Sequence, residues 1–254
     1  MNLDTFSLKG KNALVTGSQS GLGAGMAVGL AEAGANVMVH GKDSTGIAEV
    51  CAAVCAAGAR AARVEGDVGQ PGVCEELVDA TVREFGSIDI LINNAGIIRR
   101  APAADFPAKD WSDVIEVNLN AVFRLCQAAG RHMLAQGSGK IINVASLLSF
   151  QGGVFVPSYA AAKGAVAQLT KALANEWAGK GIQVNAIAPG YMATDNTAAL
   201  RADPVRSRQI LDRIPAGRWG TPRDLAGTAV FLASAAGDYV NGHVLVVDGG
   251  WLAR

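Results

Sequence analysis

The chain has 254 residues and no formal net charge, because 22 lysine and arginine residues balance 22 aspartate and glutamate residues. The signs are mixed, which argues against a nucleic acid or a membrane surface as partner and favours a small molecule. The four cysteines form no Cys-x-x-Cys pair, and no histidine stands at metal-ligand spacing. We therefore expect reduced thiols, no metal site, no membrane contact and a cytoplasmic location. The amino terminus also lacks the cationic and apolar regions of a signal peptide.

Short apolar runs bounded by turn residues alternate with longer stretches of helical spacing along the chain. The predicted strands are 12–16, 36–40, 60–65, 88–93, 139–145, 182–188 and 243–247. The predicted helices are roughly 21–33, 45–57, 71–85, 110–135, 158–179 and 222–235. This alternation predicts a single α/β domain over 1–254, a Rossmann-type doubly wound sheet of seven mainly parallel strands with helices on both faces.

Residues 190–220 follow the sixth predicted strand and are less regular, with Pro204, Pro215 and three glycines. A long irregular segment at this place is more typical of a substrate-covering lid than of a linker. We therefore expect this segment to cover the substrate.

A glycine-rich turn, Thr16-Gly-Ser-Gln-Ser-Gly-Leu-Gly23, follows the first predicted strand and opens the first predicted helix. Its glycines permit a tight turn, let the backbone approach a pyrophosphate, and leave that phosphate facing the amino end of the helix. A turn used only for packing is the alternative. The position after the first strand favours a dinucleotide-binding site.

Two further segments agree with a dinucleotide. Asp67, after the third predicted strand, could accept a hydrogen bond from an adenine amino group. Asn93-Asn94-Ala95-Gly96, after the fourth, could form the floor under a ribose. Either alone could be only a turn or a cap, since Asn, Asp and Gly favour such places.

Tyr159 and Lys163 stand four residues apart in a predicted helix, and Ser146 ends the fifth predicted strand. Positions i and i+4 share a helix face, so the ammonium can lie near the phenol and lower its pKa from about 10. The tyrosine then becomes a usable acid or base. The Ser146 hydroxyl, at the carboxyl end of a strand, could bond a substrate oxygen.

These features together resemble the classical branch of the short-chain dehydrogenase/reductase family over essentially the whole chain. The matching residues, in order, are Thr16–Gly23, Asp67-Val68, Asn93–Gly96, Asn118, Ser146, Tyr159-x-x-x-Lys163, Pro189-Gly190 and Thr194. The resemblance implies that Tyr159 is the acid/base, that Ser146 orients the substrate oxygen, and that Lys163 binds the nicotinamide ribose. It further implies that Asn118 holds a water in a proton relay; the alternative is a structural side chain at an irregular turn of its helix.

The predicted cofactor-binding set combines the glycine turn with the later motifs. It comprises Gly17, Ser18, Gln19, Ser20, Gly21, Leu22, Gly23, Gly41, Lys42, Asp67, Val68, Asn94, Ala95, Gly96, Tyr159, Lys163, Pro189, Gly190, Met192 and Thr194. Gly41 stands where an NAD-dependent chain would carry a ribose-binding acid, and Lys42 could meet a 2′-phosphate. These two residues favour NADP.

A closer resemblance is to the group of that family that acts on deoxy-gluconates, the 2-deoxy-D-gluconate 3-dehydrogenases and 2-dehydro-3-deoxy-D-gluconate 5-dehydrogenases. It rests on six stretches, 6–11, 96–100, 149–153, 188–194, 213–220 and 247–254. It implies interconversion of an alcohol and a ketone on a deoxy-hexonate, and it suggests NAD, so the choice between NAD and NADP stays open. The predicted substrate-binding residues are Arg99, Arg100, Ser146, Gln151, Tyr159 and Arg218, with the arginine pair as a bidentate carboxylate clamp.

The alternatives are a gluconate 5-dehydrogenase, a hydroxy-acid dehydrogenase, a 3-oxoacyl reductase, or a dinucleotide-binding sensor without turnover. An intact Ser146, Tyr159 and Lys163 set disfavours the sensor. Family analogy predicts a homotetramer, and the apolar residues on more than one face of the helices at 110–135 and 158–179 support an interface.

Overall fold

The computed structural model describes residues 3–254 and contains one parallel sheet, in the order β3-β2-β1-β4-β5-β6-β7. Its strands are β1 (Asn12–Val15), β2 (Asn36–Gly41), β3 (Ala61–Glu65), β4 (Ile90–Asn93), β5 (Gly139–Val144), β6 (Ile182–Pro189) and β7 (Val244–Val247). The strand order reverses at β1, which pairs with β2 on one side and β4 on the other. Ligands of such sheets bind at this point, outside the carboxyl ends of the strands.

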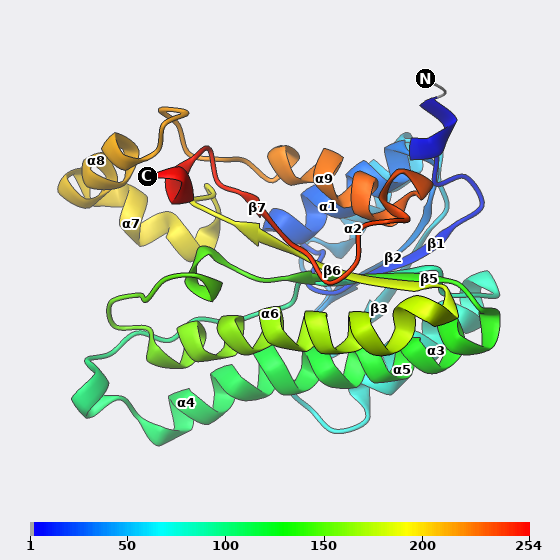
Figure 1. Ribbon diagram of the computed structural model, residues 1–254, viewed down its shortest axis with the longest axis horizontal. Coiled ribbons are helices and arrows are strands. Elements are labelled where there is room, and N and C mark those ends of the chain that lie inside the picture. Colours follow the sequence, from blue (N-terminus) through cyan, green and yellow to red (C-terminus); the bar gives the residue numbers. More distant parts are fainter. Residues whose placement is uncertain (1–2) are drawn as a thin grey trace.

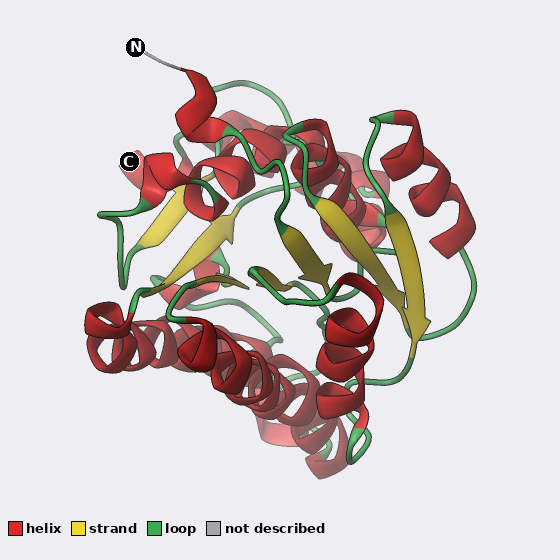
Figure 2. Cartoon of the chain, turned by 90° about the vertical axis from the view of Figure 1, so that its right-hand side faces the viewer, coloured by secondary structure: helices red, strands yellow, loops and turns green. Residues whose placement is uncertain are grey.

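Helices cover both faces of the sheet, as predicted (Figures 1 and 2). The helices are α1 (Gly21–Glu32), α2 (Ile47–Ala56), α3 (Val73–Phe85), α4 (Ala108–Ile115), α5 (Ala121–Gln136), α6 (Pro157–Trp177), α7 (Ala198–Ala202), α8 (Pro204–Arg213) and α9 (Arg223–Ala233). One hydrophobic cluster joins the sheet to α1, α2 and α9, and another joins it to α3, α5 and α6. The doubly wound fold is therefore confirmed, and the first two residues of the predicted 1–254 unit lie outside the described residues.

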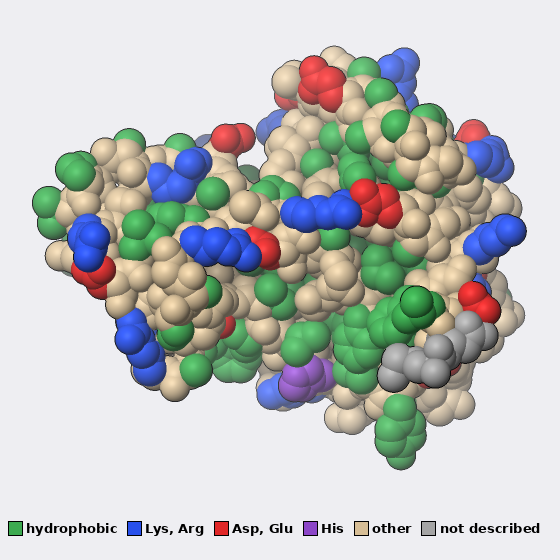
Figure 3. All heavy atoms as spheres, turned by 90° about the horizontal axis from the view of Figure 1, so that it is seen from above, with side chains coloured by type: hydrophobic (Ala, Val, Ile, Leu, Met, Phe, Trp, Pro, Cys, Tyr) green, Lys and Arg blue, Asp and Glu red, His purple; other side chains and the backbone are tan. Residues whose placement is uncertain are grey.

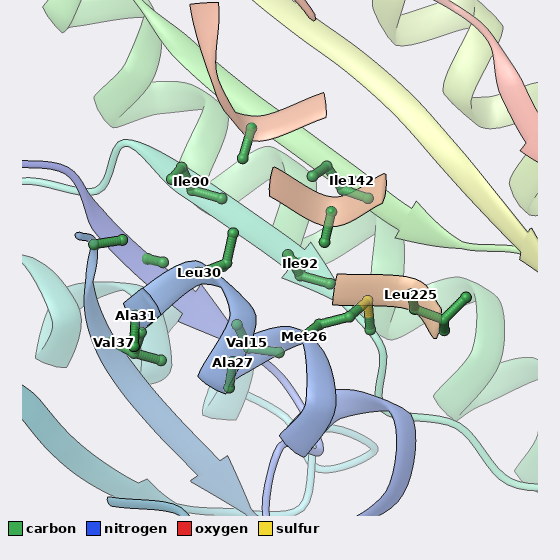
Figure 4. Packing of buried hydrophobic residues seen from close by; sticks show 14 of the residues in the cluster. Val15, Met26, Ala27, Leu30, Ala31, Val37, Ile90, Ile92, Ile142 and Leu225 are labelled. Atoms are coloured by element: carbon green, nitrogen blue, oxygen red, sulfur yellow. The ribbon is translucent and has the colours of Figure 1, made fainter. Parts of the chain in front are cut away.

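Figure 4 shows buried side chains of α1 against the sheet, with Leu225 of α9 beside them. Met26 and Leu30 of α1 are fully buried in one cluster with Ile92 of β4 and Leu225 of α9. A Cβ atom at Gly29 would lie 2.6 Å from the Cβ of Ala226, so only glycine permits this close approach of the two helices. Glycines at four-residue spacing in α1 thus have a packing role.

The predicted helix over 110–135 is interrupted. The chain forms α4, then a π-helical turn, η3 (Glu116–Asn120), and then α5. The extra residue per turn places Asn118 where both ends of its amide bond the backbone of Ile97, at 2.8 Å each. A long-range contact therefore accounts for the irregularity.

The expectation of an irregular segment is wrong for much of residues 190–220, which contain α7 and α8. The Asp203 carboxylate accepts hydrogen bonds from the backbone amides of Val205 (3.0 Å) and Arg206 (2.9 Å), and Pro204 occupies the first turn of α8. An acidic cap followed by proline is a local start signal for a helix.

Charged side chains of both signs are intermixed on the face shown in Figure 3. Across residues 3–254, no helix has the length and hydrophobicity needed to cross a membrane. The same residues hold no group of three or more His, Cys, Asp or Glu side chains arranged to bind a metal ion.

Candidate active site

A cleft of about 610 Å³ lies at the carboxyl edge of the strands and extends from Lys42 to Tyr159 and Lys163. Most of the predicted cofactor-binding residues line it. They are Gly17, Gln19, Ser20, Gly21, Leu22, Lys42, Asp67, Val68, Asn94, Ala95, Gly96, Tyr159, Lys163 and Thr194. Segments far apart in the sequence thus form one elongated site.

The glycine turn is fixed against the end of β4. Gly17 has a positive φ of 63°, and a Cβ atom there would lie 3.0 Å from the Cα of Ala95. The Asn94 side-chain amide donates to the carbonyl oxygens of Thr16 (2.9 Å) and Gly17 (3.0 Å). The turn and the Asn-Asn-Ala-Gly segment therefore form one wall of the cleft.

The amino end of α1 faces this cleft. Ser20 precedes the helix in an extended conformation, and within the described residues no side chain caps its first turn. Unclaimed amides at a helix start attract an anion, and the positive end of the helix dipole adds to the attraction. A pyrophosphate fits this cradle, because Gly17 and Gly21 bring no side chain into it.

Three residues predicted to bind the cofactor have packing roles instead and do not line the cleft. Ser18 is fully buried, and its hydroxyl donates to the Val15 carbonyl at 2.7 Å. A Cβ atom at Gly23 would lie 2.4 Å from the Gly17 oxygen. A Cβ atom at Gly41 would lie 2.2 Å from Oε1 of Gln19, so the Gln19 side chain fills that space.

Lys42 and Asp67 form an ion pair at one end of the cleft, with Nζ 2.8 Å from Oδ2. The hydrogen bond and charge of Asp67 raise the pKa of Lys42, and the nearby Arg99 charge lowers it. The hydrogen bond from Lys42 in turn lowers the pKa of Asp67. The Asp67 carboxylate is thus already bonded to Lys42, in addition to its predicted adenine contact.

Tyr159 lines the other end of the cleft, and the Ser146 side chain lies within reach of its hydroxyl, just behind the lining. Burial raises the pKa of Tyr159, whereas the Ser146 hydrogen bond and the charge of Arg100 lower it. The Lys163 ammonium lies 5.7 Å from the Tyr159 ring centroid and donates to the Val144 carbonyl at 2.5 Å. Burial lowers the pKa of Lys163 to about 8. The Arg100 charge thus adds to the effect predicted for Lys163, whose ammonium lies beside the ring.

The two adjacent arginines point to different parts of the site. Arg99 lines the cleft, and its Nε lies 3.7 Å from a carboxylate oxygen of Asp110. Arg100 instead donates to the backbone carbonyl of Asn196 at 3.2 Å, and its charge reaches Tyr159. The predicted joint clamp is therefore divided, with Arg100 on the tyrosine side and Arg99 nearer Lys42.

Of the predicted substrate-binding residues, Arg99 and Tyr159 line the cleft, whereas Arg100, Ser146, Gln151 and Arg218 do not. Arg218 makes a bidentate bond to Asp224, at 2.7 and 2.8 Å, next to the start of α9. Gln151 accepts a hydrogen bond from the Trp251 indole at 3.3 Å. Asp224 and Trp251 thus use the polar atoms that the prediction assigned to a substrate.

Four further predicted residues are buried or do not line the cleft. Asn118 is fully buried and its amide is bonded to Ile97, which gives it a structural role; its place in a proton relay stays a prediction. Pro189, Gly190 and Met192 do not line the cleft. A Cβ atom at Gly190 would lie 2.0 Å from the Leu147 side chain, so this glycine allows close packing.

The sequence interpretation missed several cleft residues, among them His40, Ile97, Glu116 and Asn196. His40 had a usable signal, because it stands near the carboxyl end of the second strand, where ligands of such sheets bind. Asn196 had none, since its place depends on the fold of the segment after β6.

Comparisons with known proteins agree with this geometry. A family model described as enoyl-(acyl carrier protein) reductase matches residues 17–252. The 2-dehydro-3-deoxy-D-gluconate 5-dehydrogenase of Dickeya dadantii is 56% identical over 255 residues, with 100% of each chain covered.

Two solved structures are also similar. One, from Agrobacterium tumefaciens with bound NADP and provisionally named a 2-deoxy-D-gluconate 3-dehydrogenase, is 54% identical with a TM-score of 0.92, covering 98% of this chain and 99% of that one. The other, a gluconate 5-dehydrogenase from Burkholderia cenocepacia in complex with NADP and tartrate, is 44% identical with a TM-score of 0.95, covering 99% of each chain.

The fold, the cleft and these matches define an NAD(P)-dependent oxidoreductase that acts on CH–OH groups. The chain belongs to the short-chain dehydrogenase/reductase family, and the resemblance seen in its motifs is confirmed.

Proposed function

We propose that the protein interconverts a secondary alcohol and a ketone on a deoxy-hexonate sugar acid. The observation that carries the proposal is the Lys163 ammonium beside the Tyr159 ring, with Ser146 next to the tyrosine, at the end of a cleft that begins at a glycine turn. A sensor without turnover needs the glycine turn but not these three groups together.

In the oxidative direction, the substrate alcohol loses a proton from oxygen and a hydride from carbon. A nicotinamide dinucleotide supplies the hydride acceptor when bound. Tyr159, as the phenolate, takes the proton at its oxygen and becomes the phenol, and Ser146 orients the substrate oxygen by a hydrogen bond. The Lys163 ammonium lies close enough to bind a ribose hydroxyl and to favour the phenolate as the proton leaves. In reduction the same groups return the proton.

The identity of the substrate is supported by the relative from Dickeya dadantii, which is similar over the whole chain. A sugar acid also suits the site, since Arg100 provides a cation near the reacting tyrosine. Kinetics with 2-dehydro-3-deoxy-gluconate, 2-deoxy-gluconate, 5-keto-gluconate and a neutral ketose, each with both cofactors, test the proposal. A preference for 5-keto-gluconate would support the gluconate 5-dehydrogenase alternative, and no turnover with any sugar acid would reject the proposal.

We further propose that NADP is the preferred cofactor. Lys42 and Arg99 gather two cations at one end of the cleft, and Gly41 brings no carboxylate. The similar structures from Agrobacterium tumefaciens and Burkholderia cenocepacia hold NADP.

The replacement Lys42→Ala tests the cofactor proposal. We expect the dissociation constant for NADPH to rise about tenfold, since a charge-assisted contact contributes roughly 1.5–3 kcal/mol and exposure reduces it. Affinity for NADH should change little, because it has no 2′-phosphate. Fluorescence titration with both cofactors measures the contrast, with Lys180→Ala as a control outside the cleft. An equal loss for both would contradict NADP selectivity.

Residues 190–220 are proposed as a lid that forms part of the same 1–254 unit. The segment leaves and rejoins the fold at one place, because Met192 and Gly220 form an isolated parallel bridge. Between them, Thr194 and Asn196 line the cleft, and the Asn196 carbonyl accepts a hydrogen bond from Arg100. Movement of this segment would therefore open and close the side of the site near Arg100.

The assembly is proposed to be a cytoplasmic homotetramer, by family analogy and from two exposed aromatic side chains. Trp111 of α4 and Phe123 of α5 are 43% and 44% exposed. Replacement of Phe123 by Glu would place a carboxylate in an apolar contact, so we expect this variant to dissociate. Analytical ultracentrifugation at micromolar concentration should show a tetramer for the parent chain and for Val205→Glu, a control on α8. A monomeric parent chain would contradict the proposal.

A further inference from the structure

His40 joins two walls of the cofactor cleft through its imidazole ring. Its Nδ1 accepts a hydrogen bond from the Gly17 amide at 2.9 Å. Because Nδ1 accepts, the ring proton is on Nε2, which donates to the Gly66 carbonyl at 2.9 Å. The ring therefore links the glycine turn to the segment that leads into Asp67, and only the neutral tautomer can make both bonds.

The backbone of His40 holds the next two residues of the same turn. Its amide donates to the Ser18 hydroxyl at 3.0 Å, and its carbonyl accepts from the amides of Ser18 (2.8 Å) and Gln19 (3.2 Å). The side chain is 2% exposed, yet the residue contributes to the lining of the cleft. Residues 17, 18 and 19 are thus all attached to one residue at the end of β2.

We propose that His40 is a positioning residue for the dinucleotide, acting through the neutral ring that holds the Gly17 amide and hence the start of the phosphate cradle. A second proton would go to Nδ1, where it would meet the Gly17 N–H and replace an acceptor by a donor. The turn would then have to shift by enough to separate the two donors. This inference rests on the proposed binding of a dinucleotide in the cleft.

The groups around His40 set the direction of the pH effect. Burial lowers the pKa of His40 below its usual 6.5, opposed by the Gly66 hydrogen bond and the Asp67 charge. Asp67 is paired with Lys42, and neither carboxylate nor ammonium changes charge between pH 5 and 7. Lys163, with a pKa lowered to about 8, stays mainly protonated over the same interval. His40 is therefore the group near the turn that titrates on the acid side.

Calorimetric titration with NAD⁺ from pH 7 down to the lowest pH at which the protein stays folded tests the proposal, because NAD⁺ carries no phosphate monoester that would itself titrate. Dissociation constants of the parent chain should be level near pH 7 and should rise up to tenfold per pH unit below the His40 pKa. Circular dichroism at each pH confirms that the protein stays folded. A level dissociation constant over the whole of that range, together with equal NAD⁺ affinities of the two variants described next, would overturn the proposal.

Two variants test the two hydrogen bonds of the His40 ring separately. His40→Asn retains an acceptor at the position of Nδ1 and cannot titrate, so its affinity should match the parent at pH 7 within about threefold and stay level at pH 5. His40→Gln retains a donor at the position of Nε2 but leaves the Gly17 amide without its acceptor, so its dissociation constant should be about tenfold higher throughout.

If His40 has only a structural role, both variants should melt at a lower temperature than the parent and should bind NAD⁺ with equal affinity. The same acid-side slope in His40→Asn as in the parent would also reject the proposal. If no dinucleotide binds to the parent chain at any pH, the proposed function itself fails, which is a different outcome from binding without pH dependence.

Discussion

Tyr159→Phe should lower kcat by about 10²–10⁴-fold while the cofactor dissociation constant stays within a factor of about two. The ring remains and only the hydroxyl is lost, and general acid–base catalysis typically contributes this much. The Ser146 hydroxyl loses its hydrogen-bond partner, but its bond from the Leu148 amide, at 3.2 Å, still holds it in place. Steady-state rates in both directions, together with fluorescence titration, measure the two effects.

Tyr191→Phe is the matched control for this experiment. Tyr191 packs against Trp219 and Trp251, with ring centroids at 5.7 and 4.5 Å, and does not line the cleft. It should keep near-normal turnover. Near-normal turnover of Tyr159→Phe would reject the assignment of the acid/base, and an equal loss in both variants would point to a general disturbance of the fold.

The sheet was predictable because local patterns and the final structure agree. The apolar runs form the strands, which are buried except at the edges β3 and β7, and the turn residues between them mark the ends of each element. The glycine turn was recognisable for the same reason, since Gly17 needs its positive φ and its lack of a side chain whatever the ligand. Asp203 and Pro204 are also a local start signal, which predicts the helix α8 that the sequence analysis had treated as irregular.

Features that depend on distant contacts were not predictable. The π-helical turn follows from the bonds between Asn118 and Ile97, 21 positions apart. The contacts of His40 with Gly17 and Gly66 span 23 and 26 positions, so its place at a strand end could suggest a cleft residue but not these bonds. Motif matching identified residue types at strand ends, but it could not predict which way their side chains point.

The arginine pair illustrates this limit most clearly. Arg99 and Arg100 are neighbours in the sequence and were predicted to act together. In the fold one faces the Lys42 end of the cleft, and the other lies between Tyr159 and the proposed lid. Successive side chains of an extended loop diverge, so adjacency in sequence says little about a shared ligand.

This divergence makes the arginine pair a test of the substrate class. We expect Arg100→Met to lower kcat/KM for a sugar acid about tenfold to more than a hundredfold. The replacement keeps much of the apolar stem and removes a charge-assisted contact of roughly 1.5–3 kcal/mol, and each 1.4 kcal/mol corresponds to a factor of ten. A neutral ketone of similar size should be nearly unaffected, because it has no carboxylate. Steady-state kinetics with both substrates measure the difference.

Arg99→Met is the matched control, because it removes the same charge from the adjacent position. Because Arg99 lies nearer Lys42, its replacement should weaken the binding of NADPH more than it lowers kcat/KM for the sugar acid. If Arg100→Met lowers kcat/KM equally for the sugar acid and the neutral ketone, Arg100 acts by ordering the lid through its bond to the Asn196 carbonyl, and not through a substrate carboxylate. If Arg99→Met alone impairs the sugar acid, the carboxylate binds on the other side of the cleft. The guanidinium of Arg218 is held by Asp224, so that cation is an alternative only if this pair opens.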